Sequence, residues 1–139
     1  MVGILKLEIV TPDGMGYSGN AESVTLQGAD GQVTILPQHV RLIIQLAPGE
    51  MIVRQGGKEE YLAVGEGLAN VTGDSVAILT DMAIVVENID EARAEEARQR
   101  AAARLREKIS AEELASVNAS LARSLTQLHV KRRRHGSTG

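Results

Sequence analysis

The sequence predicts a β-sandwich followed by an α-helical hairpin, and two observations support that fold class. Up to residue 87, short runs of branched and aliphatic residues alternate with glycine-containing turns, which is typical of antiparallel β-structure. From residue 88 onward helix formers dominate, and residues 92–108 contain no glycine, proline or β-branched residue. We therefore expect a β-sandwich domain over residues 1–87 and a two-helix arm with a basic tail over residues 88–139.

The first half predicts nine short strands separated by recognisable turns. At residues 11–14 (TPDG), proline presets φ and glycine accepts a positive φ, and residues 55–58 (QGGK) have the composition of a tight hairpin. The expected strands cover residues 4–10, 22–26, 32–36, 42–46, 51–55, 60–64, 68–71, 76–79 and 83–86. So many short strands in fewer than 90 residues favour an antiparallel sandwich or a flattened barrel.

Two capping-box patterns mark the helix starts. Asn88 is followed three residues later by Glu91, and Ser110 is followed three residues later by Glu113, so a helix break is expected near residues 109–110. The second helix is expected to place one apolar stripe against the first: Leu114, Val117, Leu121, Leu125 and Leu128. Because the first helix offers mainly alanine, the hairpin should bury little area and should be able to open.

Charge is divided unevenly along the chain. Residues 1–87 contain 4 Lys and Arg against 11 Asp and Glu, whereas residues 88–139 contain 11 against 7. A basic arm on an acidic sandwich indicates an acidic partner, although a solvated helical surface explains the same charges. A stand-alone adaptor that uses this arm to bind nucleic acid or an acidic protein is therefore one hypothesis. It lacks the aromatic stacking and groove-reading motifs typical of nucleic-acid binding.

The sequence offers little for catalysis. There is no cysteine, no Gly-x-Ser-x-Gly elbow and no phosphate-binding loop that ends in Gly-Lys-Ser/Thr. The three histidines, His39, His129 and His135, do not form a metal-ligand pattern. No apolar run approaches the ~20 residues that span a bilayer. We expect a noncatalytic protein without catalytic residues, metal or resident cofactor.

The order of the segments resembles the epsilon subunit of bacterial F-type ATP synthases over roughly residues 3–130. The likeness includes residues 7–14 (LEIVTPDG), residues 31–39 (GQVTILPQH), residues 46–49 (LAPG), residues 60–67 (EYLAVGEG) and residues 89–94 (IDEARA). The Ile-Leu-Pro-x-His block followed at this distance by Ile-Asp-x-x-Arg-Ala is the most specific part.

This resemblance implies a noncatalytic rotor subunit of the central stalk, at the cytoplasmic face of the bacterial inner membrane. Its sandwich would bind the gamma subunit and the c-subunit ring, which couples proton or other ion transport to ATP synthesis. Its helices would fold down as a hairpin or rise along gamma into the alpha/beta catalytic head and inhibit ATP hydrolysis. The implied gamma/c-ring interface residues are Gln32, His39 and Arg41. The basic residues expected to contact the head are Arg123, Lys131, Arg132, Arg133 and Arg134.

In some members of that family the folded hairpin binds ATP as a regulatory ligand. The matching positions here are Ile89, Asp90, Arg93, Ala94, Arg100 and Arg123. Two departures weaken the match, because Ile84 stands at an acidic position and Gln127 at an arginine position. The alternative, which we favour, is that Asp90 caps a helix and Arg93 packs on the sandwich.

Overall fold

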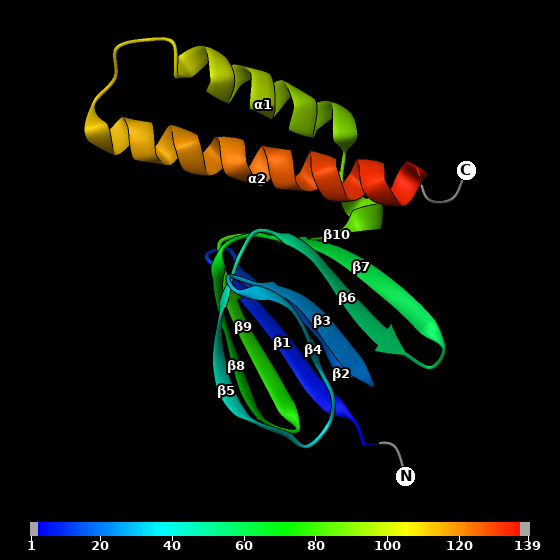
Figure 1. Ribbon diagram of the computed structural model, residues 1–139. Helices are drawn as coiled ribbons and strands as arrows, with labels where there is room; N and C mark the ends of the chain where they lie inside the picture. Colours follow the sequence, from blue (N-terminus) through cyan, green and yellow to red (C-terminus); the bar gives the residue numbers. More distant parts are fainter. Residues whose placement is uncertain (1–2, 137–139) are drawn as a thin grey trace.

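The computed structural model describes residues 3–136, except the side chains of residues 39, 40 and 135. Within these residues, a curled β-sheet structure forms one layer and two antiparallel helices lie over one end of it (Figure 1). The strands are β1 (Leu5–Thr11), β2 (Gly14–Ala21), β3 (Ser23–Gly28), β4 (Gly31–Ile35), β5 (His39–Leu46), β6 (Gly49–Gln55), β7 (Lys58–Val64), β8 (Gly67–Gly73), β9 (Ser75–Thr80) and β10 (Ala83–Val85). A 3-10 turn, η1 (Val86–Asn88), leads to α1 (Glu91–Arg104) and α2 (Ala111–Gly136). We call β1–β10 the sandwich and the two helices the arm.

The strands follow one hydrogen-bonded path, β10-β7-β6-β3-β5-β8-β9-β1-β2, with β4 attached to β3. The pairs are antiparallel except β1 with β9, which run parallel. Alternate residues of β1 point inward, so that Leu7 and Ile9 are fully buried beside Val76 and Ile78 of β9. The predicted core of Val, Ile, Leu and Ala is therefore present, and the predicted fold class is confirmed.

The prediction missed β2, which brings the number of strands in the described residues to ten rather than nine. Its sequence, GMGYSGNA, has three glycines and no run of branched residues, so local preference does not indicate a strand. The turn after β1 folds this segment back, and its register with β1 runs from Thr11 opposite Gly14 to Leu5 opposite Ala21. Gly14 has a φ of 114°, which suits this turn.

The helix starts were predicted with mixed success. Ser110 caps α2 as expected, since the Glu113 amide donates to its hydroxyl oxygen at 3.2 Å. Asn88 does not cap α1, because it belongs to η1, and Asp90 takes that role by accepting a hydrogen bond from the Arg93 amide at 3.1 Å. The first helix also ends at Arg104, earlier than the composition indicated. No helix among the described residues is long and apolar enough to cross a membrane.

The predicted apolar stripe of α2 is only partly buried. Leu128 is buried, but Leu114 and Leu125 are exposed. The deeply buried Val130 was not predicted to face a partner. The reason is that α2 packs against both α1 and the sandwich, so its buried arc is wider than a two-helix seam requires. Ser124 and Thr126 are buried on this arc, and their hydroxyls donate to the carbonyl oxygens of Ser120 and Ala122.

Candidate functional site: the contact between arm and sandwich

A second apolar cluster joins the arm to the sandwich. Val130 of α2 is 0% exposed and packs with Ala63 of β7, Met82, Val86 and Ile89, which are also buried. The strand β10 and η1 place the last three of these beside the outer face of β7, where Ala63 lies opposite Ile84. The cluster is distinct from the sandwich core, so the arm rests on its own apolar contact area.

A buried carboxylate lies beside this cluster. Glu50 of β6 is opposite Ala63 of β7, and its side chain is only 4% exposed. Arg134 donates from Nε and Nη2 to the two carboxylate oxygens of Glu50, and its Cζ lies 3.9 Å from the centre of the Tyr61 ring. Arg133 Nη1 lies 3.9 Å from Glu50 Oε1. Two cations of the basic tail, by which we mean residues 131–134, therefore face the buried carboxylate of Glu50. One of them, Arg134, is also stacked on the Tyr61 ring.

Three more polar contacts follow the same face of α2. Lys131 Nζ donates to the carbonyl oxygen of Val86 at 3.0 Å, and Gln127 Nε2 lies 3.2 Å from Met82 Sδ. One turn further toward the helix start, Arg123 Nη1 lies 3.6 Å from Asp81 Oδ2. Positions 123, 127, 130, 131 and 134 recur at helical spacing, which is why one face of α2 reaches the sandwich along its whole second half.

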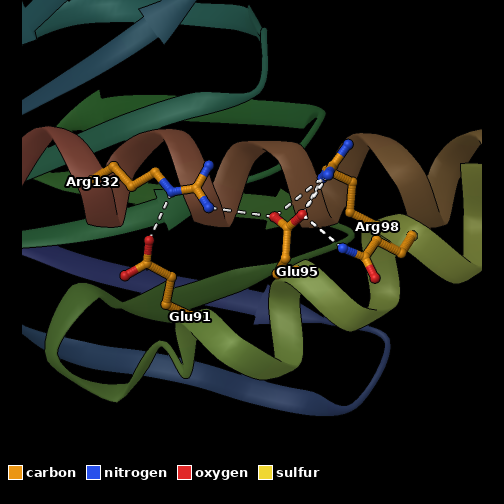
Figure 2. A network of polar contacts seen from close by, with 5 residues as sticks. Glu91, Glu95, Arg98 and Arg132 are labelled. Atoms are coloured by element: carbon orange, nitrogen blue, oxygen red, sulfur yellow. Dashed lines mark hydrogen bonds and ion pairs between the residues drawn. The ribbon is translucent and has the colours of Figure 1, made fainter.

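A separate charged network joins the two helices (Figure 2). Arg132 donates to Glu91 at 2.7 Å and to Glu95 at 3.3 Å, and Arg98 also donates to Glu95. The hydrogen bond from Arg98, followed by the charges of Arg98 and Arg132, lowers the pKa of Glu95 to about 2. Because the side chains of Arg132 and Glu91 are 57% and 43% exposed, their pair contributes to alignment of the helices more than to stability.

The basic residues predicted to contact a catalytic head all have partners within this chain. Arg123 pairs with Asp81. Lys131 donates to Val86. Arg132 joins the helices, and Arg133 and Arg134 face Glu50. In this conformation the arm lies folded down and its cations are engaged with the sandwich or with α1.

The residues of the predicted ATP motif do not line one common pocket. Ile89 and Ala94 are buried, Asp90 caps α1, and Arg93 and Arg100 are exposed. The expectation that Arg93 packs on the sandwich is therefore wrong. Of the six motif residues, Arg123 alone lines the pocket of about 260 Å³ between α2 and the loop after β7. The two departures from the motif both contribute to packing here: Ile84 lies against the second apolar cluster and Gln127 contacts Met82.

Of the three predicted interface residues of the sandwich, the two whose side chains are described lie toward different ends of β5. Gln32 and Arg41 are exposed, whereas the side chain of His39 lies outside the described residues. Gln32 follows the β3–β4 turn, where Gly28 is opposite Leu46 at the end of β5, and Arg41 lies near the start of β5.

Sequence reasoning missed an apolar row on the outer face of the sandwich. Leu68, Leu79, Val10 and Met15 lie opposite one another in successive strands β8, β9, β1 and β2, and all four are exposed. Ile43 of β5, 68% exposed, is a further apolar residue on the same sheet. The sequence does contain an indication of this exposed surface. In residues 42–44 (LII) three apolar residues follow one another, whereas a strand with one solvent-exposed face would alternate apolar with polar residues.

Two family models together match most of the chain. The β-sandwich domain of the ATP synthase delta/epsilon chain matches residues 4–86, and the long α-helix domain of the same chain matches residues 87–132. The chain belongs to the ATP synthase delta/epsilon chain family. Members of this family are noncatalytic subunits of the central stalk, so the predictions of an epsilon-type subunit and of a protein that is not an enzyme are confirmed.

Individual relatives agree with this assignment. The ATP synthase epsilon chain of Hydrogenovibrio crunogenus is 37% identical over 126 residues, which cover 91% of this chain and 88% of that protein. The epsilon chain of Dehalococcoides mccartyi is 40% identical over 134 residues, which cover 94% and 96%. The fold is also similar to a chain in the Euglena gracilis mitochondrial ATP synthase structure, with a TM-score of 0.64, 22% identity and coverage of 97% and 81%. These comparisons give the nucleic-acid adaptor hypothesis no support.

Proposed function

We propose that this delta/epsilon-family chain couples ion translocation to rotation at the cytoplasmic face of a bacterial inner membrane. In this proposal, the sandwich (residues 1–87) binds the gamma subunit and the c-subunit ring, and the arm (residues 88–139) regulates ATP hydrolysis. The bacterial relatives support the location. The observation that carries the regulatory part is that the cations of α2 are held by Asp81, Val86 and Glu50 in the folded-down arm.

The apolar row Leu68–Leu79–Val10–Met15 is the surface we assign to gamma. A monomeric protein rarely leaves such residues exposed in register across four strands, and a permanent subunit contact would bury them. We assign Gln32, His39 and Arg41 to the rest of the stalk surface. Since Gln32 and Arg41 lie toward different ends of β5, we expect them to contact different parts of the stalk.

The arm would inhibit when it leaves the sandwich and extends into the alpha/beta catalytic head. There, Arg123 and the basic residues 131–134 would exchange their partners in this chain for acidic groups of the head. Such an exchange gives the arginines new acidic partners, which offsets part of the cost of separating them from Asp81 and Glu50. The acidic groups of the sandwich, Asp81 and Glu50, therefore compete with acidic groups of the head for the basic residues of α2.

The direct test measures ATP hydrolysis by the cognate complex that contains either the full chain or a chain ending at Glu87. Higher hydrolysis with the shortened chain, at equal incorporation, would support the inhibitory arm. Equal hydrolysis would reject inhibition and leave the sandwich as the coupling element. Failure of the full chain to incorporate would reject the stalk assignment.

For the ATP motif, we propose that residues 89–94 cap and pack rather than bind nucleotide. Support comes from Asp90, whose carboxylate already accepts the Arg93 amide, and from Ile84 and Gln127, which are uncharged at the acidic and arginine positions of the motif. Titration of the isolated chain with ATP to millimolar concentrations, followed by amide exchange, should leave the arm unchanged. Saturable protection of residues 89–123 would overturn this proposal.

A further inference from the structure

The arm is attached to the sandwich by the second half of α2. Figure 1 shows α2 lying between α1 and the strands, with α1 on the far side. The first part of α2, residues 111–122, has no buried residue, whereas Ser124, Thr126, Leu128 and Val130 are all buried. The principal partners of α2 outside the arm are β6 and β7 of the sandwich and η1, which follows it. The arm therefore depends on a short contact near its C-terminal end.

Within this contact, Glu50 requires a cation. Its side chain is 4% exposed, and removing one partner of such a buried pair leaves a charge that water cannot solvate. Arg134 provides two hydrogen bonds to it and lies over Tyr61, whose hydroxyl in turn donates to Glu59. Arg133, 3.9 Å away, is the second cation within reach.

The basic residues of the tail have different tasks although they are adjacent in sequence. Successive helical residues point about 100° apart. Lys131 and Arg134 consequently contact η1 and β6, whereas Arg132 contacts Glu91 and Glu95 of α1. If the hairpin moved as a unit, the contacts of Arg132 would travel with it, and those of Lys131 and Arg134 would break.

We propose that Glu50 and Tyr61 form an intramolecular binding site for Arg134, and that the binding of Arg134 there determines whether the arm stays on the sandwich. Anything that raises the arm must expose Glu50 to water or supply another cation to it. This inference concerns the isolated chain. Only its consequence for ATP hydrolysis rests on the function proposed above.

The test compares amide exchange of the full-length chain with that of two variants. Arg133→Gln/Arg134→Gln removes both cations from Glu50, and Arg132→Gln is the matched control that removes an adjacent arginine of the same tail. We expect the double variant to raise exchange in residues 82–90 and 127–134 at least about tenfold, with the sandwich core unchanged. Arg132→Gln should leave residues 82–90 at the level of the unmodified chain.

Two results of this comparison would overturn the proposal. The first is unchanged exchange in residues 82–90 of the double variant, and the second is an equal increase in the Arg132→Gln control. Glu50→Gln provides an independent check that keeps the shape of the side chain. Combined with Arg134→Gln, it should raise exchange less than the product of the two single increases, because both variants remove one contact. A full product would also overturn the proposal.

ATP hydrolysis by the complex then distinguishes the attachment of the arm through Arg134 from the proposed inhibition of the enzyme. With Glu50→Gln, which changes the same contact but keeps every arginine proposed to meet the head, a released arm should change the extent of inhibition. If exchange shows that the arm is released while the hydrolysis rate matches that of the unmodified complex, the proposed binding site for Arg134 is supported and the inhibitory function is rejected. If exchange shows no release of the arm, the proposed binding site is rejected whatever the hydrolysis rate is.

Discussion

Arg134 and Glu50 meet across 84 residues of sequence, and their contact links the last described turns of α2 to strand β6. Beside them, Val130 fills an apolar cluster with η1 and β7. The arm is consequently a docked element with its own contact area rather than a free hairpin.

Val130→Ala should destabilise the docked arm by about 1–3 kcal/mol, because it leaves a cavity in the second apolar cluster. Leu125→Ala is the control, since Leu125 is 46% exposed on the same helix and should change stability by less than about 0.5 kcal/mol. Urea unfolding followed by helical circular dichroism would measure both. Equal losses for the two variants would contradict the docked geometry.

Asp90→Ala should cost about 1 kcal/mol of helix stability by removing the acceptor for the Arg93 amide. Asn88→Ala, which changes the residue that the sequence pattern suggested as the cap, should have a much smaller effect because Asn88 lies in η1. Thermal unfolding of the two variants in parallel would distinguish them. A larger loss for Asn88→Ala would show that the helix begins earlier than in this structure.

Glu95 should titrate with a pKa of about 2, well below its usual value of 4.5. Since folding lowers this pKa, the stability that the Glu95 carboxylate contributes, chiefly through its bond to Arg98 within α1, is complete above pH 4.5 and is lost as the pH falls toward 2. Carboxyl chemical shifts recorded by NMR between pH 6 and 1.5 would follow the titration. Arg98→Gln should return the pKa toward 4.5, and an unchanged midpoint would show that Arg98 is not the main cause.

Leu79→Gln should weaken incorporation into the stalk without unfolding the isolated chain, because Leu79 is exposed at the middle of the apolar row. We expect at least a tenfold loss of affinity for gamma if this row is buried there. Lys58→Gln, on the hairpin between β6 and β7, is a control that should bind normally. Normal binding by Leu79→Gln would move the interface to another face.

Gly67→Ala should destabilise the sandwich by about 1–3 kcal/mol, because a Cβ there would lie 1.9 Å from the carbonyl oxygen of Leu79. Gly16→Ala in β2 meets nothing closer than 3.4 Å and should be neutral or slightly stabilising. Denaturant unfolding of the two variants provides the comparison. A neutral Gly67→Ala would mean that β8 and β9 separate easily.

Local sequence patterns predicted much of this molecule because the patterns report local physics. Runs of branched and aliphatic residues between turns identified β1 and β9, and the Ser-x-x-Glu pattern at Ser110 identified the start of α2. They failed at β2, where three glycines hide a strand that pairs through its backbone with β1. For α1 the capping-box pattern indicated Asn88, but η1 displaces the helix start by two residues, and the other expectation, that Asp90 caps a helix, is confirmed.

The sequence by itself determined the order of sandwich and arm, the aliphatic core and the family. Only the tertiary structure decided which face of α2 is buried, that Glu50 lies under residues 133–134, and that Ile84 and Gln127 contribute to the contact between α2 and the sandwich. The physical reason is that the spacing of apolar residues along a helix shows which faces of the helix are apolar. It does not show which part of the protein covers each face. That choice depends on contacts between residues far apart in the chain, such as Glu50 and Arg134.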